Sequence, residues 1–288
     1  MNARISAGMS ASRIAALGAV GVGATANVDV EVVARTGSTN ADLLARASDL
    51  ARPTLLVAEH QSAGRGRAGR SWLSAAGASL TFSLAWKFSG APQRLLGLPL
   101  AAGVALAEAL AAQGVPVQLK WPNDVLKDGA KLAGILIETR SGGGGGDGGT
   151  WAVIGIGLNL LMPEDVKQRI GRPVATAPSL ARMDRDVLMA ALLRALALAM
   201  EQFEAAGFAP FCARWDGLHA WRGQPVAIFD AGAVVQQGVA VGVDDSGRLL
   251  LDTAGGRVAV LAGDVSLRRV DNGGDNGAAK CIAPCADA

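Results

Sequence analysis

The sequence predicts an α+β protein in which a larger domain is followed by a small β-barrel. Two observations lead to this fold class. Before Gly223, stretches with the two-residue alternation of strands are interspersed with stretches in which apolar side chains recur every three to four residues, as in helices. From Gly223 onwards only short strand-like runs remain, separated by turns rich in Gly and Asp. Mixed elements followed by an all-strand segment indicate two units with separate cores.

We expect the larger domain to span residues 29–222, with elements that follow from local patterns in chain order. Residues 28–34 alternate apolar and polar side chains, as a half-buried strand does. The run Ser38-Thr39-Asn40 supplies polar side chains that cap the start of a helix reaching Leu50, and Pro53 ends it. Further strands are expected at 55–57, 79–86, 117–121, 131–139 and 151–160, with a turn at Asp128-Gly129 before the fourth of these, and further helices at 94–113 and 184–206.

Residues 223–270 form the expected barrel, with strands at 225–229, 234–243, 248–252 and 257–261. The two ends, residues 1–28 and 271–288, are rich in Gly, Ala and Asn, and we expect both to be poorly ordered. An apolar stretch around residues 14–26 leaves a secretory signal as the alternative interpretation of the first end. No uninterrupted run of about 18 apolar residues occurs, so no membrane-spanning segment is expected.

Composition narrows the function classes. The 27 Lys and Arg residues nearly balance the 25 Asp and Glu residues, and a net charge of +2 argues against bulk duplex nucleic acid as the main partner. Two histidines, His60 and His219, are too few for a histidine-rich metal cage. The three cysteines, two of which are Cys281 and Cys285 in the tail, form neither a disulfide framework nor a close metal-binding spacing.

The most informative segment is the run 59–70, Glu-His-Gln-Ser-Ala-Gly-Arg-Gly-Arg-Ala-Gly-Arg, in which arginines alternate with glycines. Glycine lets the backbone approach a ligand closely, and a guanidinium group pairs with phosphate or carboxylate oxygens. No Asp or Glu occurs between Glu59 and Glu108, so no acidic residue nearby in the sequence competes for the arginines. The segment therefore predicts an anion-binding loop, with an exposed turn carrying solvated charges as the alternative.

A second cluster combines Lys120-Trp121-Pro122-Asn123-Asp124 with the strand that begins at Lys131. Pro122 ends the preceding strand because it cannot donate a hydrogen bond, which leaves Asn123 and Asp124 where polar groups can reach a pocket. Lys131, expected nearby across a hairpin, suits a carboxylate or phosphate, and Asp124 suits Mg²⁺ or a ribose hydroxyl. An ordinary turn with a surface lysine is the alternative.

A third cluster, Gly155-Ile156-Gly157-Leu158-Asn159, lies within an otherwise apolar strand. Glycines inside a strand indicate close contact with a ligand or with another part of the chain, and tight strand packing is the alternative. The side chain of Asn159 could turn a polar amide towards the same pocket.

Together these segments resemble the catalytic region of bacterial biotin–protein ligases. The family pattern has a Ser-Thr-Asn helix start, Gln-x-Ala-Gly-Arg-Gly-Arg-x-Gly-Arg, Lys/Arg-Trp-Pro-Asn-Asp, Lys-Leu-Ala-Gly-Ile-Leu and Gly-x-Gly-x-Asn, and all five recur here in this order between residues 30 and 160. The strands after residue 223 are similar to the SH3-like C-terminal domain of the family. The resemblance implies a mixed-sheet catalytic domain of the biotin/lipoate ligase type followed by an SH3-like barrel.

The resemblance also implies an activity: ligation of biotin to a biotin carboxyl carrier protein. In this family the biotin carboxylate attacks the α-phosphate of ATP, and the resulting biotinyl-5′-AMP acylates a lysine of a carrier domain, usually that of acetyl-CoA carboxylase. ATP and Mg²⁺ serve as co-substrates, and no tightly bound cofactor is expected. Joining two anions needs cations and positioning rather than a dedicated base, which agrees with the scarcity of histidine.

Site residues follow from the motif positions of the resemblance. For biotin they are Ser38, Thr39, Asn40, Gln61, Arg65, Gly66, Arg67 and Lys131. For the nucleotide they are Arg65, Arg70, Trp72, Asn123 and Asn159. The resemblance implies catalytic roles for Lys131, Arg67 and Asp124, and roles in Mg²⁺ binding for Asp124 and Asn159. We expect the loop from Arg65 to Arg70 to be disordered without ligand and to close over the labile adenylate.

The implied partners are biotin, ATP and the carrier domain of acetyl-CoA carboxylase. Fewer than thirty residues precede the first expected strand, and they do not resemble the winged helix–turn–helix of repressor-type relatives. We therefore expect the monofunctional type, without DNA or membrane binding and located in the cytoplasm. Homodimers occur among relatives, so a homodimer stays open. Ala41 departs from relatives that carry an amide side chain there, without loss of a motif.

Three other functions compete with this interpretation. A lipoate–protein ligase shares the fold family and reaction type, but the Arg-Gly-Arg loop and Trp-Pro-Asn-Asp favour biotin, and competition between the two acids would discriminate them. A nucleic-acid-binding module that uses Gly-Arg repeats is disfavoured by the weak net charge, and a steep salt dependence of nucleic-acid affinity would identify it. An inactive scaffold would release no pyrophosphate.

Overall fold

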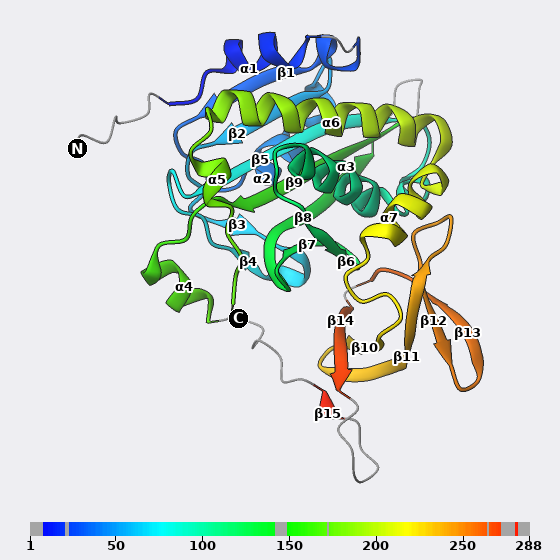
Figure 1. The fold of residues 1–288 in the computed structure, drawn as a ribbon. Helices are drawn as coiled ribbons and strands as arrows, with labels where there is room; N and C mark the ends of the chain where they lie inside the picture. Colours follow the sequence, from blue (N-terminus) through cyan, green and yellow to red (C-terminus); the bar gives the residue numbers. More distant parts are fainter. Residues whose placement is uncertain are drawn as a thin grey trace.

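The computed structural model describes residues 8–20, 23–141, 149–171, 173–263, 265–271 and 280–281. The larger domain is built on a seven-stranded mixed sheet, and the C-terminal part on a separate sheet of six strands (Figure 1). The predicted α+β class with a C-terminal β unit is confirmed.

The large sheet has the strand order β1-β2-β5-β9-β8-β7-β6. β1 is parallel to β2, and every other neighbouring pair is antiparallel. The strands are β1 (Asp29–Val33), β2 (Thr54–Ala58), β5 (Ser79–Phe88), β6 (Gln118–Lys120), β7 (Asp124–Lys127), β8 (Ala130–Ser141) and β9 (Thr150–Asn159). A separate two-stranded hairpin consists of β3 (Gly64–Arg65) and β4 (Ser71–Trp72).

Every residue of β2 is buried because helices cover both faces of the sheet. Leu55 and Val57 face the main core, which includes α3 (Leu98–Ala112) and α6 (Arg185–Ala206). Leu56, between them, belongs to a smaller core with Leu43 of α2 (Thr39–Ala45) on the opposite face. The sheet is therefore the middle layer of the domain, with α2 on one side and α1, α3 and α6 on the other (Figure 1).

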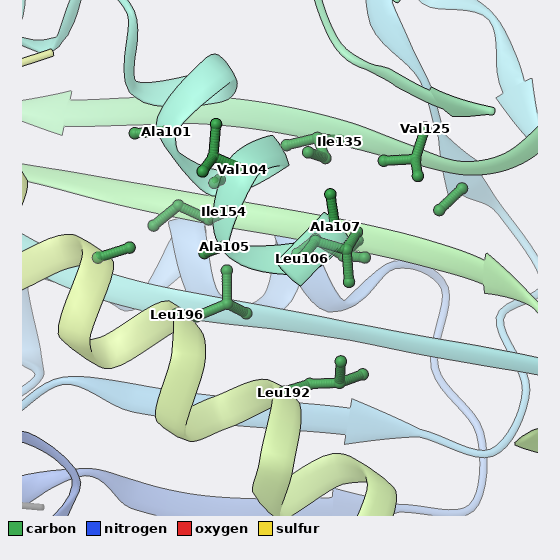
Figure 2. Packing of buried hydrophobic residues seen from close by; sticks show 14 of the residues in the cluster. Ala101, Val104, Ala105, Leu106, Ala107, Val125, Ile135, Ile154, Leu192 and Leu196 are labelled. Carbon is green, nitrogen blue, oxygen red and sulfur yellow. The ribbon is translucent and has the colours of Figure 1, made fainter. Parts of the chain in front are cut away.

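The apolar helix α3 lies at the centre of the main core. Figure 2 shows its side chains close to Ile135 and Ile154 of the sheet and to Leu196 of α6. The segment Pro92–Ala112 is long and apolar enough to cross a membrane by length and composition, but 67% of it is buried inside the protein, as in core helices. Glu108 interrupts the apolar run, so the segment is not an uninterrupted apolar stretch of about 18 residues.

The predicted helix at 94–113 is shorter than expected. A 3₁₀ helix, η4 (Pro92–Leu95), precedes α3, and Gly97 between them has a φ of +82°. A Cβ at Gly97 would also lie 2.7 Å from the Phe208 side chain, so this position is restricted to glycine by its backbone angle and by its neighbour. The helix expected to reach Leu50 likewise ends at Ala45 and continues as the 3₁₀ helix η2 (Ala47–Asp49).

The strand β7 was not predicted. The sequence led us to expect a single connection between residues 117–121 and 131–139, but Asp124 pairs with Lys120 on β6 and with Gly134 on β8. The turn at Asp128-Gly129 therefore joins β7 to β8. The four residues of β7 are too few for a periodic pattern, and cross-strand pairing alone defines the strand.

The expectation of a poorly ordered N-terminal end is wrong for residues 10–18. Ser10 caps the helix α1 (Ala11–Gly18), whose Ile14 is fully buried against the main core. Arg13 forms an ion pair with Asp184 at the start of α6, with 2.6 Å between the charged atoms. These contacts with a helix far along the chain hold a segment whose own composition predicts little structure. A 3₁₀ helix, η1 (Gly23–Asn27), leads from α1 towards β1, and residues 1–7 and 21–22 lie outside the described residues.

Between β9 and the C-terminal sheet lie α4 (Glu164–Ile170), α5 (Pro178–Ala181), α6, η5 (Ala209–Phe211) and α7 (Cys212–Leu218). The predicted start of α6 at Asp184 is confirmed, because its carboxylate accepts hydrogen bonds from the first-turn backbone N–H groups of Asp186 and Val187.

The C-terminal sheet has the order β13-β12-β11-β10-β14-β15. Its strands are β10 (Pro225–Asp230), β11 (Ala233–Val243), β12 (Leu249–Thr253), β13 (Gly256–Val260), β14 (Ser266–Asp271) and β15 (Lys280–Cys281). Four of them match the predicted strands, whereas β14 was missed and β15 takes two residues from the tail that we expected to be flexible. Cys285 and the remaining tail residues lie outside the described residues. Trp121 is fully buried and donates from Nε1 to the carbonyl of Gly247 at 3.2 Å, which joins this unit to the larger domain.

Candidate functional site

A pocket lies against the large sheet and is also lined by residues of the C-terminal unit. Its lining comes from the start of α2, the strands β5, β8 and β9, the β3–β4 hairpin, and Val265–Leu267 at the start of β14. We call residues 64–72, which contain the β3–β4 hairpin, the flap. The pocket therefore combines chain segments that are up to about two hundred residues apart, and both structural units contribute to it.

A connected set of polar side chains, which we call the floor, reaches the pocket surface at Thr39, Asn40 and Gln61 and continues beneath it. The backbone N–H of Thr39 donates to Oε1 of Gln61 at 2.8 Å, and the Thr39 hydroxyl lies 2.6 Å from Oγ of Ser83. Ser83 donates to Oδ1 of Asn40 at 2.6 Å, and Nδ2 of Asn40 donates to Oε2 of Glu138 at 3.0 Å. Thr39, Asn40 and Ser83 are buried, so their hydrogen bonds hold the floor in one geometry.

Two glycines of β9 leave room for one side chain of the floor and one side chain of the flap. A Cβ at Gly155 would lie 2.1 Å from Oδ1 of Asn40, and a Cβ at Gly157 would lie 2.1 Å from the Trp72 ring. Real side chains do not approach so closely, so only glycine admits these two neighbours. Tight packing and a nearby binding site, which the sequence left as alternatives, are thus combined: the glycines pack against side chains that line the pocket.

The flap carries the three predicted arginines and is anchored at two points. Arg65 forms an ion pair with Glu138 on β8 at 2.8 Å. Arg67 donates to Oδ1 of Asn123 at 3.1 Å and also to the carbonyl of Gly263, in the connection between β13 and β14. The flap is described here as a hairpin, and its disorder in the absence of ligand stays a prediction.

Lysine and aspartate side chains meet at the far end of the same pocket. Nζ of Lys131 lies 2.6 Å from Oδ1 of Asp124, and Nζ of Lys120 lies 3.7 Å from Oδ2. Lys131 is also 5.8 Å from the centre of the Trp72 ring, on the inner side of the flap. With Arg67 of the flap lining the same pocket, this end is a cationic region suited to anionic groups.

A second pocket adjoins the first through shared residues. Trp72 and Lys131 line both, and Asn159 and Arg169 line the second alone. Oδ1 of Asn159 and Nε1 of Trp72 are buried and have no hydrogen-bond partner among the described residues. A buried acceptor and a buried donor left unpaired beside a pocket indicate that a polar ligand completes them.

The structure brings most of the predicted site residues to the first pocket. Those lining it are Ser38, Thr39, Asn40, Gln61, Arg65, Gly66, Arg67, Arg70, Trp72, Asn123, Asp124 and Lys131. Asn159 does not line it and instead borders the second pocket, where its Nδ2 lies 3.5 Å from the Lys131 carbonyl.

The expected Mg²⁺ role of Asp124 and Asn159 does not fit this arrangement. Asp124 has an ammonium group near each of its carboxylate oxygens, and Asn159 borders the other pocket. Within the described ranges, no group of three His, Cys, Asp or Glu side chains gathers as metal ligands do. In this structure the two residues line different pockets.

Some residues in or next to the pocket had no assigned role at the level of sequence. Ser83 and Glu138 complete the floor, and Lys120 lies beside Asp124, which also pairs with Lys131. The sequence placed these three residues in predicted strands or motifs but gave them no role. A signal for Ser83 was available: Ser79, Thr81 and Ser83 recur every second residue in an apolar strand, which places polar side chains on one face. Gly263 and residues 265–267 carry no such signal.

Comparison with known proteins identifies the family. Residues 32–159 match the biotin/lipoate A/B protein ligase family, and residues 223–268 match the biotin protein ligase C-terminal domain. The chain is 40% identical over 247 residues to the biotin–[acetyl-CoA-carboxylase] ligase of Mycobacterium tuberculosis, an alignment that covers 82% of this chain and 88% of that protein. The chain belongs to the biotin/lipoate A/B protein ligase family.

Two further matches cover a similar share of this chain. The bifunctional ligase/repressor BirA of Escherichia coli is 36% identical over 244 residues, covering 84% of this chain and 75% of BirA. Among solved structures, the biotin protein ligase of Aquifex aeolicus in complex with biotin and ATP has a TM-score of 0.68 and 29% identity, covering 83% of this chain and 98% of that one. The resemblance stated from the motifs is confirmed, and it extends into the C-terminal unit.

Proposed function

We propose that this chain is a biotin–protein ligase, which activates biotin with ATP to biotinyl-5′-AMP and transfers the biotinyl group to a lysine of a biotin carboxyl carrier protein. Relatives named as biotin–[acetyl-CoA-carboxylase] ligases support the reaction, and the A. aeolicus neighbour contains both biotin and ATP. The observation that carries the proposal is one pocket with a buried polar floor at one end and cations at the other.

The floor suits the ureido ring of biotin. That ring offers one carbonyl acceptor and two N–H donors, and the floor presents hydroxyl and amide groups of both kinds from Ser38, Thr39 and Gln61. Because Oε1 of Gln61 is already engaged by the Thr39 N–H, the amide Nε2 of Gln61 is the group left to meet an acceptor. Biotin bound in this direction points its carboxylate towards Lys131.

The first chemical step joins two anions, and the cationic end of the pocket supplies what this requires. A carboxylate oxygen of biotin bonds to the α-phosphorus of ATP as the bond from that phosphorus to the β-bridging oxygen breaks, and pyrophosphate leaves. Lys131 and Arg67 offset the repulsion between the carboxylate and the phosphate, and Asp124 holds the Lys131 ammonium group in place. No proton is transferred in this step, so no general base is needed.

We place the nucleotide in the second pocket. Trp72 and Lys131 border both pockets, so a nucleotide there would have its α-phosphate next to the biotin carboxylate. The unpaired Oδ1 of Asn159 and Nε1 of Trp72 supply an acceptor and a donor for the nucleotide. Mg²⁺ would bind together with the phosphates of ATP. The proposal does not use Asp124 and Asn159 as a pair of Mg²⁺ ligands.

The second step transfers the acyl group. The amine of the carrier lysine bonds to the biotinyl carbonyl carbon, the bond from that carbon to the phosphate oxygen breaks, AMP leaves, and the amine loses a proton. Until the carrier arrives, the flap would shield the mixed anhydride from water. We propose the carrier domain of acetyl-CoA carboxylase as the partner and the cytoplasm as the location. DNA binding is not part of the proposal, and a homodimer stays open.

The decisive test is transfer of biotin to a purified carrier domain, detected by mass spectrometry, with and without ATP. Mass increase that requires biotin, ATP and the carrier lysine supports the proposal. Lipoate is the competing acid: if lipoate rather than biotin is transferred, the reaction class stands and the substrate is wrong. Absence of both transfer and pyrophosphate release would identify an inactive scaffold.

A further inference from the structure

We propose that Glu138 is a positioning residue that couples the flap to the floor of the biotin pocket. A single carboxylate oxygen, Oε2, accepts a hydrogen bond from Nδ2 of Asn40 at 3.0 Å and pairs with Arg65 of the flap at 2.8 Å. One of these partners is buried in the floor and the other lies 43% exposed on the flap. The inference rests on the proposed function, because it concerns how biotin is held.

The backbone pairing of β8 with β9 places Glu138 where both partners can reach it. Glu138 lies opposite Val153 on β9, two residues along that strand from Gly155. Gly155 has no side chain, so the Asn40 side chain occupies the space above it and reaches Glu138. The glutamate side chain is 25% exposed, which leaves it open to the flap arginine.

Glu138 determines which way the Asn40 amide points. A carboxylate and the Leu136 carbonyl, 3.3 Å away, are both acceptors, so the NH₂ group of Asn40 must face them. The amide oxygen then faces Ser83, and only a donated hydrogen from the Ser83 hydroxyl can satisfy it at 2.6 Å. Without the carboxylate, the acceptor that remains for Nδ2 of Asn40 among the described residues is the more distant Leu136 carbonyl.

The amide orientation in turn sets the direction of the hydroxyl groups beneath the ligand. Ser83 has one hydrogen and gives it to Asn40, so the hydrogen of the Thr39 hydroxyl serves both the 2.6 Å contact with Ser83 and the 3.0 Å contact with Oε1 of Gln61. Gln61 Oε1 keeps the Thr39 N–H as its donor. The Thr39 hydroxyl oxygen is then left as an acceptor, and the Gln61 amide NH₂ as a donor. Glu138, three side chains away, thereby defines the pattern that meets the biotin ureido group.

The same carboxylate oxygen also holds the flap. When Arg65 is docked, the negative charge of Glu138 is shared between the guanidinium group and the Asn40 amide, and the flap lies over an ordered floor. When Arg65 moves away, the carboxylate is more exposed to water and orients Asn40 less firmly. Closure of the flap and order in the floor are therefore coupled through one residue that makes no contact with the reacting atoms.

Two substitutions separate these roles. Glu138→Ala removes both contacts, and we expect the KM for biotin to rise about tenfold with the KM for ATP nearly unchanged. Glu138→Gln keeps an amide oxygen for Asn40 but loses the charge that pairs with Arg65. We expect its KM for biotin to rise only about twofold, whereas loss of biotinyl-5′-AMP to hydrolysis in the absence of carrier should rise about as much as in Glu138→Ala.

A matched control removes a similar ion pair elsewhere. Glu108 pairs with Arg214 at 2.5 Å on the surface of the α3–α7 region and does not line either pocket, so Glu108→Ala should match the wild type in both measurements. Thermal unfolding of every variant reports on folding. If Glu138→Ala fails to fold, the rate at which Glu138→Gln loses biotinyl-5′-AMP to hydrolysis tests the role of Glu138.

The outcomes are distinguishable from failure of the proposed function. A wild-type protein that forms no adenylate from biotin and ATP overturns the proposed function. A wild-type protein that forms it, together with Glu138 variants that keep wild-type biotin KM and adenylate retention, overturns the role of Glu138 alone. Equal rises in the KM for biotin and ATP in Glu138→Ala would also overturn it, because they indicate general structural damage.

Discussion

The floor and the flap of the pocket are built in opposite ways. In the floor, Thr39, Asn40 and Ser83 are at most 4% exposed, and each is hydrogen-bonded to another polar side chain. In the flap, Arg65 is 43% exposed, and Ala68 adopts a left-handed backbone conformation with a φ of +52°. The difference indicates that recognition of biotin is built into the folded sheet, whereas protection of the intermediate depends on a segment held by a few side-chain contacts.

The largest expected effect comes from the cation that faces both regions. Lys131→Ala removes the ammonium group that meets the biotin carboxylate and the phosphate, and we expect adenylate formation to fall about 100- to 1,000-fold. The floor is untouched, so biotin binding measured by calorimetry should weaken far less than the rate. A rate within tenfold of wild type would contradict the assigned role, and Lys127→Ala, at the end of β7, is the control because Lys127 lines neither pocket.

The floor is expected to be intolerant of added volume. Gly155→Ala places a Cβ 2.1 Å from Oδ1 of Asn40, which must move and break its hydrogen bond with Ser83. We expect the free energy of unfolding to fall by about 1–3 kcal/mol from overpacking, and biotin affinity to fall about 100-fold. Calorimetry and thermal unfolding test both effects, and unchanged biotin affinity would show that the floor is not rigid.

The flap is expected to affect retention of the intermediate more than binding of the vitamin. Arg67→Ala loses the contacts with Asn123 and with the Gly263 carbonyl, which anchor the flap to both structural units. We expect biotinyl-5′-AMP to be lost to hydrolysis about tenfold faster without carrier, because water reaches the anhydride. Hydrogen exchange of residues 64–72 in the presence of biotin and ATP should also be faster. An intermediate as long-lived as in the wild type would refute the role of the flap.

The smallest effect is expected from a methyl group in the flap. In Gly66→Ala, the backbone has an ordinary φ of −118°, and the nearest atom to the added Cβ, the Arg70 carbonyl oxygen, lies 3.3 Å away. An exposed segment can yield by a few tenths of an ångström, so we expect about a twofold change in biotin affinity. If Gly66→Ala weakens biotin binding as much as Gly155→Ala, the contrast between a rigid floor and a yielding flap is wrong.

The sequence predicted the parts of the site that depend on local chemistry. The cap at Ser38 and Asp184, the buried strand at residues 55–57 and the glycines of β9 all follow from residue types and their spacing. The residues assigned to the site from motif positions line one pocket, apart from Asn159, and their roles stay predictions. Elements held mainly by distant contacts were missed: α1, which packs on α6, and β7 and β14, which are defined by pairing with other strands.

The sequence by itself determined the chemical groups of this protein and the order in which they occur: arginines among glycines, an amide and a carboxylate after a proline, and polar residues in an apolar strand. Only the tertiary structure decided which of them share hydrogen bonds, as in the link from Gln61 through Thr39, Ser83, Asn40 and Glu138 to Arg65. Local propensities depend on neighbours in the chain, whereas these hydrogen bonds join residues up to 98 positions apart and exist only when strands from distant segments pair in one register.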